Sequence, residues 1–315
     1  MEYSGLIQKY KVNRPLSEEE RKDQLKQKQK LDVEPHYLFA VIKSNSSYLE
    51  LADKYYGWRG WLSSGTLIVI AICIGAIAMF AISLVFSWDR VHSKNPAGAI
   101  GVFVFMFAVL LGLILFGTWA LRKESFFLTH FPARLNRKTR TIHLFRPDRS
   151  GTILTVPWDD VHFNLAPGQT LGYWDIRGHL LDSDRATVKE SFSLGTPWGE
   201  KEALKQHWEF IRRYMENGPQ QLLPLIPMYL PIANTKERAA FGLQRLLLLF
   251  PSSIAARTLL LPIFLFCAAG RIFANATSKI PEWPADIEAS CQIEPGDPFE
   301  RDERQNKPNR LGWLS

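Results

Sequence analysis

Two long apolar runs dominate the hydropathy pattern of the chain. They lie at residues 62–87 and 97–121, and neither run contains a charged residue. Each run exceeds the roughly 20 residues that a helix needs to cross the hydrocarbon core of a bilayer. The residues between them, 88–96, are mostly polar. The pattern predicts a transmembrane helical hairpin with a short turn at 88–96, and the rest of the chain is arranged around it.

The distribution of basic residues predicts the orientation of this hairpin. Residues 1–61 contain eleven Lys and Arg, and more follow the second run from Arg122 onward, whereas the turn has only Arg90 and Lys94. Lys and Arg are retained on the cytoplasmic side of a membrane. We therefore expect a multi-pass protein of the bacterial inner membrane whose N-terminus and later domain are cytoplasmic and whose turn is periplasmic.

Aromatic and small residues predict how the hairpin is anchored and packed. Amphipathic aromatics and cations crowd the start of the first run, as the headgroup layer favours. This predicted membrane-interface anchor comprises Tyr55, Tyr56, Trp58, Arg59 and Trp61. Small residues four apart let helices approach closely, and this spacing predicts helix–helix packing at Ala71, Gly75, Ala108 and Gly112. The absence of ionisable residues in both runs disfavours ion or proton transport.

Residues 1–61 are predicted to form a cytoplasmic N-terminal arm. Ser17 and Glu20 have the spacing of a capping box, and the polar residues 21–30 behind them predict a solvated helix or a disordered segment. A short buried strand is expected at 37–42. A helix is then predicted from the spacing of Tyr48, Leu51, Ala52, Tyr55 and Tyr56.

From residue 125 the pattern alternates between apolar and polar positions, as half-buried strands do. Turn residues recur at intervals of roughly ten positions, which is typical of an antiparallel sheet that closes or doubles over. Thr196-Pro197 then begins a helix with one apolar stripe, which ends at Gly218. The predicted class is an α+β membrane protein, in which an antiparallel β-rich domain at 122–218, closed by a C-terminal helix, follows the hairpin.

The pattern in the last third of the chain predicts a helical region that does not cross the membrane again. Residues 219–293 begin with a Pro-rich extended segment and continue with an apolar stretch at 241–273 that contains Arg257 and Arg271. Placing one Arg at the centre of a bilayer costs roughly 2.5–3.5 kcal/mol. We favour helices packed on the domain or lying in the inner interface, with a third crossing as the alternative. Residues 294–315 have little apolar content and predict a disordered tail.

Composition changes this picture little. The chain has 315 residues, a net charge of +7 and three cysteines. In a membrane protein an excess of basic residues indicates Lys and Arg beside anionic lipid. Nucleic-acid binding is not predicted, because the sequence shows no stripe of basic residues interleaved with aromatics. Cys73 and Cys267 lie in apolar runs, and no disulfide framework is indicated.

The candidate chemistry is limited to acidic, histidine and basic positions. The glycines form no nucleophile elbow, phosphate loop or dinucleotide motif, and we expect no catalytic residue, cofactor or metal. Asp159 and Asp160 have the pattern of a turn, and His143 and His162 lack zinc-ligand spacing. One basic cluster is the candidate lipid or partner surface, although a positive-inside flank also explains it. This basic cluster comprises Arg134, Arg137, Lys138 and Arg140.

Two resemblances follow from these motifs. Strands closed by one amphipathic helix resemble the pleckstrin-homology-like fold, and residues 136–140 and 156–161 resemble strand and turn segments of its bacterial members. The whole layout resembles an uncharacterised family of proteobacterial two-helix membrane proteins, through Tyr-Tyr-Gly-Trp-Arg-Gly at 55–60, Val-Pro-Trp-Asp-Asp at 156–160 and Trp283-Pro284. Some members of that family are encoded near type VI secretion genes, which implies an accessory or immunity role.

The sequence thus predicts a non-enzymatic, membrane-anchored module whose partners are the bilayer and another protein. A type VI secretion-associated accessory or immunity protein is the most concrete form of this hypothesis. One alternative is a lipid-headgroup-responsive module that binds anionic lipid through the basic cluster. A second alternative is a membrane-bound hydrolase, which requires Asp159, Asp160 or His162 to share a pocket.

Overall fold

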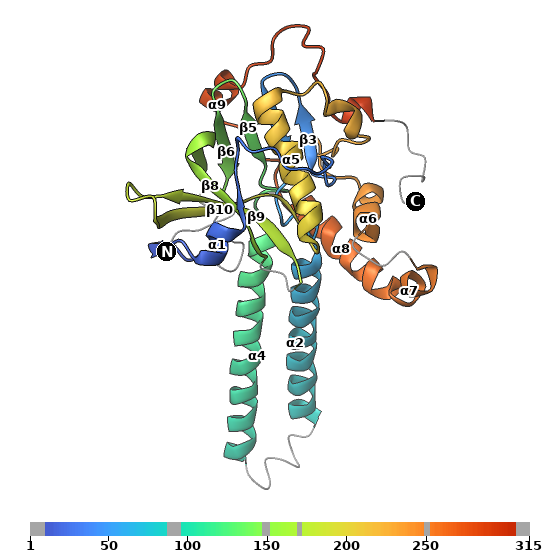
Figure 1. Cartoon of the computed structure of the whole chain (residues 1–315). Helices are drawn as coiled ribbons and strands as arrows, with labels where there is room; N and C mark the ends of the chain where they lie inside the picture. The colour runs from blue at the N-terminus through green and yellow to red at the C-terminus, as the bar shows by residue number, and fades with distance from the viewer. Residues whose placement is uncertain (1–9, 87–95, 147–151, 169–171, 249–252, 307–315) are drawn as a thin grey trace. The chain divides into compact units, whose positions relative to one another are not determined.

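The computed structural model describes residues 10–86, 96–146, 152–168, 172–248 and 253–306 (Figure 1). The chain divides into two compact units, each assembled from separated stretches of sequence. The first, here called the β unit, comprises residues 1–58, 128–238 and 279–315. The second, here called the helical unit, comprises residues 59–127 and 239–278.

The β unit contains two five-stranded antiparallel sheets. The first sheet has the order β3 (Val41–Ser44), β4 (Tyr48–Leu51), β5 (Ala133–Asn136), β6 (Thr141–Phe145) and β7 (Ile153–Pro157). The second has the order β1 (Arg14–Pro15), β10 (Thr187–Trp198), β9 (Trp174–Leu181), β8 (Val161–Pro167) and β2 (Gln24–Leu25). A single 3-10 turn, η1 (Trp158–Asp160), connects the two sheets between β7 and β8.

The first sheet unites residues from both sides of the hairpin. Strand β4 pairs with β5 in antiparallel register, with Tyr48 opposite Asn136 and Leu51 opposite Ala133. The predicted division into an arm at 1–61 and a β domain at 122–218 therefore differs from the observed one. The helix predicted from Tyr48 to Tyr56 is also wrong at its start, because Tyr48–Leu51 is a strand that pairs with β3 on one side and with β5 on the other.

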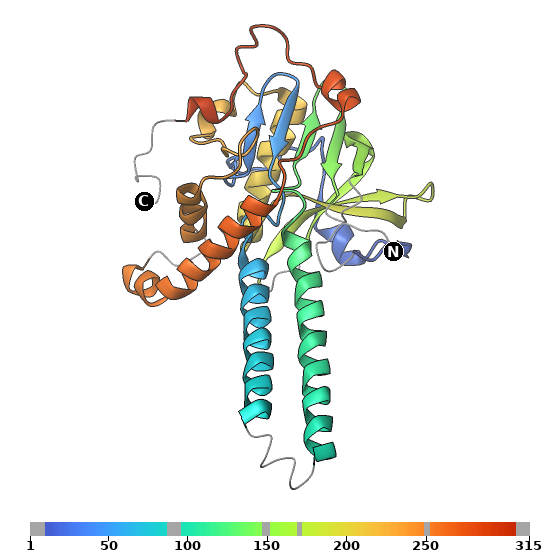
Figure 2. The ribbon, with the colours of Figure 1, turned by 180° about the vertical axis from the view of Figure 1, so that it is seen from behind.

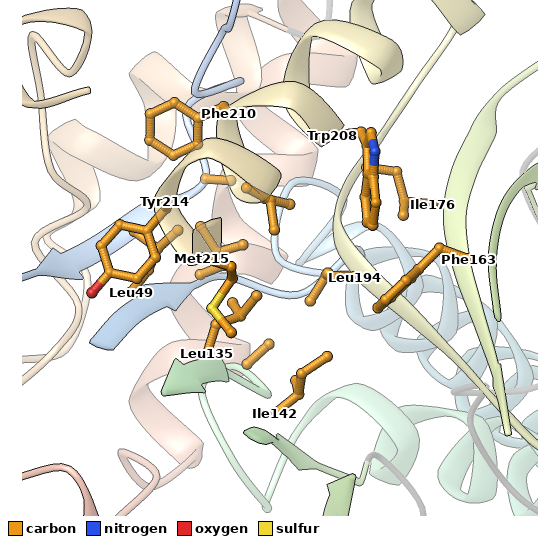
Figure 3. Close-up of a cluster of buried hydrophobic side chains, with 14 of the residues drawn as sticks. Leu49, Leu135, Ile142, Phe163, Ile176, Leu194, Trp208, Phe210, Tyr214 and Met215 are labelled. Carbon is orange, nitrogen blue, oxygen red and sulfur yellow. The ribbon is translucent and has the colours of Figure 1, made fainter. Parts of the chain in front are cut away.

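Helix α5 (Lys201–Asn217) closes the sheets over a shared core. Its predicted apolar stripe is fully buried, at Leu204, Trp208, Ile211 and Met215. Figure 3 shows Trp208 beside Phe163 of β8, with Leu135 and Ile142 of the first sheet in the same cluster. Trp158 of η1 stacks on Trp208 with ring centroids 5.4 Å apart. An antiparallel β-rich domain closed by a helix is therefore confirmed.

Two long helices, α2 (Trp61–Phe86) and α4 (Pro96–Glu124), run side by side in the helical unit (Figures 1 and 2). Both are long and apolar enough to cross a membrane. Much of their apolar surface is exposed, as at Val85, which is 74% exposed. Monomeric soluble proteins rarely expose contiguous apolar patches this large. Of the predicted turn at 88–96, residues 88–95 lie outside the described residues.

The two helices approach each other at a position that the small-residue spacing does not identify. Ala71, Gly75, Ala108 and Gly112 are all exposed. The close approach involves Gly117, where an added Cβ would lie 3.1 Å from Cγ1 of Ile70. The predicted packing positions are therefore wrong. A four-residue spacing marks one stripe on a helix but does not determine which stripe meets the neighbour.

The apolar stretch at 241–273 forms shorter helices. These are α6 (Ala239–Leu248), α7 (Ile254–Leu259) and α8 (Leu261–Thr277). The longest of them, α8, has 17 residues, fewer than the roughly 20 needed for a span. Its buried side is occupied by Phe264, Cys267, Gly270, Arg271, Ala274 and Asn275.

Several short elements complete the β unit, and some of them differ from the prediction. Helix α1 (Glu18–Lys22) begins with the predicted capping box of Ser17 and Glu20, and it is shorter than expected because β2 follows. The remaining elements are η2 (Leu223–Leu225), α9 (Ala285–Ser290) and η3 (Glu303–Gln305). Part of the tail that was predicted to be disordered is ordered, because the backbone of Arg301 pairs with Ser44 of β3.

Candidate functional site

A row of polar side chains crosses the outer face of the first sheet. The register places Lys43 opposite Glu50, Glu50 opposite Arg134, and Arg134 opposite His143. Directly opposed residues of an antiparallel pair point to the same face, and opposite charges there attract each other. The core-facing positions between them, such as Leu49 and Leu135, are buried in the shared core. The two faces of this sheet therefore have different roles.

A C-terminal segment covers part of this polar face. Ile287 of α9 and Cys291 pack against Tyr48 of β4, and Trp283 joins the edge of this cluster. Trp283 also makes an edge contact with Phe145, with ring centroids 4.6 Å apart. The Trp283-Pro284 motif singled out in the sequence therefore forms a lid on the sheet.

Beneath this segment lies a cavity of about 360 Å³. Its walls come from β3, β4, β5 and the segments around residues 233 and 282. The lining residues are Lys43, Glu50, His130, Arg134, Ala233, Asn234, Ile280, Pro281, Glu282, Trp283 and Glu288. The size is within the range of roughly 300–1,000 Å³ that is typical of small-molecule sites. We refer to it as the Arg134 cavity.

Arg134 is held in a fixed orientation within this cavity. Its Nε and Nη2 atoms lie 2.9 and 2.8 Å from Oε2 of Glu50. Its guanidinium carbon lies 4.3 Å from the ring centroid of Tyr48 and 4.5 Å from that of Trp283. Stacking between two aromatic faces and pairing with a carboxylate are the contacts that a planar guanidinium makes best.

The third nitrogen of Arg134 is bound less completely. Nη1 lies 3.1 Å from Oε1 of Glu288, but it makes no hydrogen bond of acceptable geometry. The side chain of Arg134 is 3% exposed, whereas that of Glu288 is 53% exposed. One donor of a buried cation thus faces a carboxylate that is largely in solvent.

The local electrostatics follow from burial and from this pairing. Burial acts to lower the pKa of Arg134, but Glu50, Tyr48 and Glu288 together more than offset this effect, and the pKa is raised overall. Burial also raises the pKa of Tyr48, so its hydroxyl stays protonated. At His143, burial and the nearby Arg134 both lower the pKa. At neutral pH the row therefore contains a charged Arg134 beside a neutral His143.

The other members of the basic cluster do not line this cavity. Lys138 lies 2.6 Å from Glu294, and Arg137 donates to the carbonyl of Ser46 at 3.4 Å. Arg140 bridges Asp159 and Glu216, with Nη2 2.6 Å from Asp159 Oδ1 and 2.7 Å from Glu216 Oε1. The predicted surface is therefore divided: Arg134 is buried, and the other three cations are bound within the chain.

The predicted interface anchor is divided between the two units. Tyr56 of the β unit is buried, and its hydroxyl donates to Glu237. Trp58 of the β unit makes an edge contact with Tyr173 at 5.5 Å. Tyr55 and Trp61 are half-buried, whereas Arg59 is buried in the helical unit. The motif at 55–60 is thus largely engaged in packing within its own units.

Arg59 and Gly60 directly precede α2 and belong to the helical unit. Arg59 Nη2 donates to the carbonyl of Ala274 at 3.0 Å and to Ser278 Oγ at 2.8 Å, at the end of α8. A cation at this end of a helix satisfies free carbonyls and opposes the helix dipole. Gly60 has φ +99°, and an added Cβ would lie 2.5 Å from the backbone nitrogen of Arg271. This position therefore requires glycine.

The residues proposed for hydrolysis are far from an enzyme arrangement. Asp159 lies in η1 and pairs with Arg140, whereas His162 contacts Gln24 and the carbonyl of Glu20. Neither the Arg134 cavity nor the small apolar cavity beside Phe192 is lined by Asp159, Asp160 or His162. Within the described residues, no group of His, Cys, Asp and Glu has the arrangement of a metal site.

The structure brings together one triad that the sequence pattern did not reveal. His179 Nδ1 lies 2.7 Å from Ser191 Oγ, and its Nε2 lies 3.3 Å from Glu20 Oε1. Ser–His–carboxylate contacts resemble those of a hydrolase. However, His179 is 0% exposed and Ser191 is 3% exposed. A buried serine cannot meet a substrate, so we assign this triad a structural role between α1 and the second sheet.

The Arg134 cavity was only partly accessible to sequence analysis. The sequence pattern indicates Arg134 as part of the basic cluster and Trp283 as part of a motif, but it does not single out Lys43, Glu50 or His130. Their alternation along β3 and β4 is the one signal that was present, since Lys43 and Glu50 take the polar positions of their strands. Lys43 and Glu50 are united by the local pairing of β3 with β4, but the pairing that brings Arg134 beside Glu50 spans the whole hairpin and has no local signature.

Comparison with known proteins gives one result. Neither the curated proteins nor the solved structures contain a match to this chain. A family model does match, over residues 108–295. This range begins within α4 and includes β5 to β10, α5 to α9 and Arg134. The chain therefore belongs to DUF6708, a family of unknown function.

Proposed function

We propose that the protein is a non-enzymatic protein-interaction module anchored in the bacterial inner membrane, with the β unit in the cytoplasm. The observation that carries this proposal is the pairing of β4 with β5. The chain between these neighbouring strands contains both α2 and α4, so the β unit is attached to the hairpin through two adjacent strands. A domain attached at two points is held at the membrane surface, where it can bind a protein partner.

The arrangement of the β unit supports a binding role. We propose a pleckstrin-homology-like fold for it, because two antiparallel sheets share one core and a helix, α5, follows the last strand. Folds of this kind host many functions, so the ligand must be argued from the site. An accessory or immunity role in type VI secretion is the most concrete form of the proposal, and it depends on the resemblance noted above.

The two alternatives have weaker support. Lipid-headgroup binding required free cations in the basic cluster, and Arg140 and Lys138 instead pair with carboxylates of the chain. Hydrolysis required Asp159, Asp160 or His162 in one pocket, and neither cavity contains them. Partner binding by the polar face requires neither arrangement.

Site-specific photo-crosslinking in cells tests the proposal. A photoreactive amino acid at Glu282, which is exposed beside the Arg134 cavity, should capture one protein in stoichiometric amount from membranes. The matched control is Lys205 on α5, whose side chain is 43% exposed. Capture of the same protein at Glu282 but not at Lys205 supports the proposal. Equal capture at both positions, or no capture at either, contradicts it.

A further inference from the structure

We propose that the Arg134 cavity is a binding site for a carboxylate group, with Arg134 as its principal binding residue. The carboxylate belongs to a small carboxylic acid or to the C-terminus of a peptide. This inference goes beyond the proposed function. Binding of a small carboxylic acid in the cavity does not require that the protein also binds a protein partner.

The first argument is the incomplete binding of Arg134. Buried polar atoms are hydrogen-bonded in the great majority of cases. Nη1 of Arg134 is shielded from solvent, and its ion pair with Oε1 of Glu288 at 3.1 Å is not a hydrogen bond. Nε and Nη2 are occupied by Glu50, so Nη1 is the donor that a ligand would use.

The second argument is the character of Glu288. Its carboxylate is 3.1 Å from Nη1, and therefore marks a position where a carboxylate is attracted to Arg134. It is largely exposed and misaligned, so little is lost when it moves away. A ligand carboxylate that replaces it leaves the charge around Arg134 unchanged. Glu288 thus acts as an internal competitor that occupies the site in the absence of ligand.

The third argument is preorganisation. The ring centroids of Tyr48 and Trp283 lie 4.3 and 4.5 Å from the guanidinium carbon, and Glu50 binds Nε and Nη2. A planar donor that is already immobilised loses little freedom when an anion binds, which favours affinity. Charge-assisted bonds between guanidinium and carboxylate are also among the stronger hydrogen bonds in proteins.

The remaining lining determines what else the ligand carries. Lys43 lines the same cavity and supplies a further cationic donor, and the cavity volume of about 360 Å³ exceeds that of a single carboxylate. Glu282 is exposed at the rim, where it disfavours a ligand that is anionic throughout. We therefore expect a ligand with one carboxylate in the cavity and a neutral or cationic group toward the rim.

Isothermal titration calorimetry on the full chain in detergent micelles tests this inference. The probes are butyrate, 4-aminobutyrate and a tetrapeptide of neutral side chains that ends in a free carboxylate, with sulfate and choline as controls for other charges. Binding of a carboxylate probe in preference to sulfate and choline is the expected result. Tighter binding of the peptide than of the small acids identifies a protein source, and the reverse identifies a metabolite.

Two variants make the result specific to the site. Glu288→Gln removes the internal competitor and should tighten carboxylate binding three- to tenfold. Arg134→Lys keeps the charge but removes the planar set of guanidinium N–H donors, and it should weaken binding at least tenfold. Lys138→Gln, outside the cavity, should leave the affinity unchanged. The inference is overturned if no carboxylate binds to either the natural protein or Glu288→Gln, or if Glu288→Gln does not tighten binding. A negative calorimetric result with positive crosslinking at Glu282 would overturn this inference alone.

Discussion

Glu124, the last residue of α4, accepts a hydrogen bond at 2.7 Å from the backbone amide of Ser63, in the first turn of α2. The amide of Gly60 donates to the other carboxylate oxygen at 2.7 Å. The first amides of a helix have no partners within the helix, and an anion there also interacts favourably with the helix dipole. The end of one long helix therefore caps the beginning of the other.

Removing this cap should destabilise the helical unit. Glu124→Ala leaves two buried amides without an acceptor, and we expect a loss of about 1–2 kcal/mol, within the range measured for helix caps. Thermal unfolding in detergent micelles, monitored by circular dichroism, measures the effect. The control is Glu202→Ala, which removes an exposed carboxylate of α5 and should change the midpoint little. Equal effects of the two substitutions would contradict the capping role.

Gly270 should tolerate no side chain. An added Cβ would lie 2.0 Å from Ser64 Oγ and 2.4 Å from the Gly60 carbonyl oxygen. Gly270→Ala should therefore destabilise the helical unit by about 1–3 kcal/mol or more. Gly75→Ala and Gly112→Ala are matched controls, because nothing lies within 4 Å of either added Cβ. A larger loss of thermal stability at Gly75 than at Gly270 would restore the packing prediction made from the sequence.

The pairing of Arg134 with Glu50 should be strongly coupled. Arg134→Ala leaves a buried carboxylate without its partner, and we expect a loss of about 3–5 kcal/mol. Glu50→Ala has the same consequence for the cation. Because the double variant removes both charges, its loss should be well below the sum of the single losses. A double-mutant cycle in the free energy of unfolding measures this coupling, and additive losses would refute it.

Acid should destabilise the β unit through His207. Burial lowers the pKa of His207 from 6.5 to about 4, and its Nδ1 faces the carbonyl oxygen of His36 at 3.2 Å. Between pH 6.5 and 4 the unfolded state binds a proton that the folded state does not. Stability is therefore complete above pH 6.5 and decreases toward pH 4, by at most about 3 kcal/mol.

A variant isolates this contribution. His207→Asn retains a side-chain N–H donor near the His36 carbonyl but has no proton to gain in this range. The slope of unfolding free energy against pH, measured between pH 4 and 7, should be smaller in His207→Asn than in the natural protein. An unchanged slope would show that other groups cause the acid sensitivity.

Cysteine labelling tests the predicted orientation. Cys73, Cys267 and Cys291 are free but buried, so they should give little background. A membrane-impermeant maleimide added to intact spheroplasts should label Ser93→Cys in the predicted periplasmic turn but should not label Lys205→Cys on α5. Labelling of Lys205→Cys alone would reverse the orientation.

Local patterns predicted the elements whose causes are local. The long helices follow from runs without charge, and the stripe of α5 follows from residues three and four apart that all meet the core. The capping box of Ser17 and Glu20 depends on three residues of spacing and was predicted correctly.

The missed features depend on contacts between residues far apart in sequence. Strand β4 lies between β3, which precedes it closely in sequence, and β5, which comes more than eighty residues later. Arg134 is buried because Trp283 covers it and Glu50 neutralises it, and neither condition has a signal near Arg134. Basic residues that flank a membrane helix look alike in the sequence, whether they are buried or exposed.

The pairing of β4 with β5 also determines the order in which the chain can fold. When β4 leaves the ribosome, β3 has been made but β5 has not, and both apolar helices must be synthesised before the five-stranded sheet can be completed. Non-local pairing of this kind is slow and leaves strands exposed in the meantime. The sheet can therefore be completed only after both helices of the hairpin have been synthesised, and a nascent chain stalled before residue 133 can pair β3 with β4 but cannot add β5.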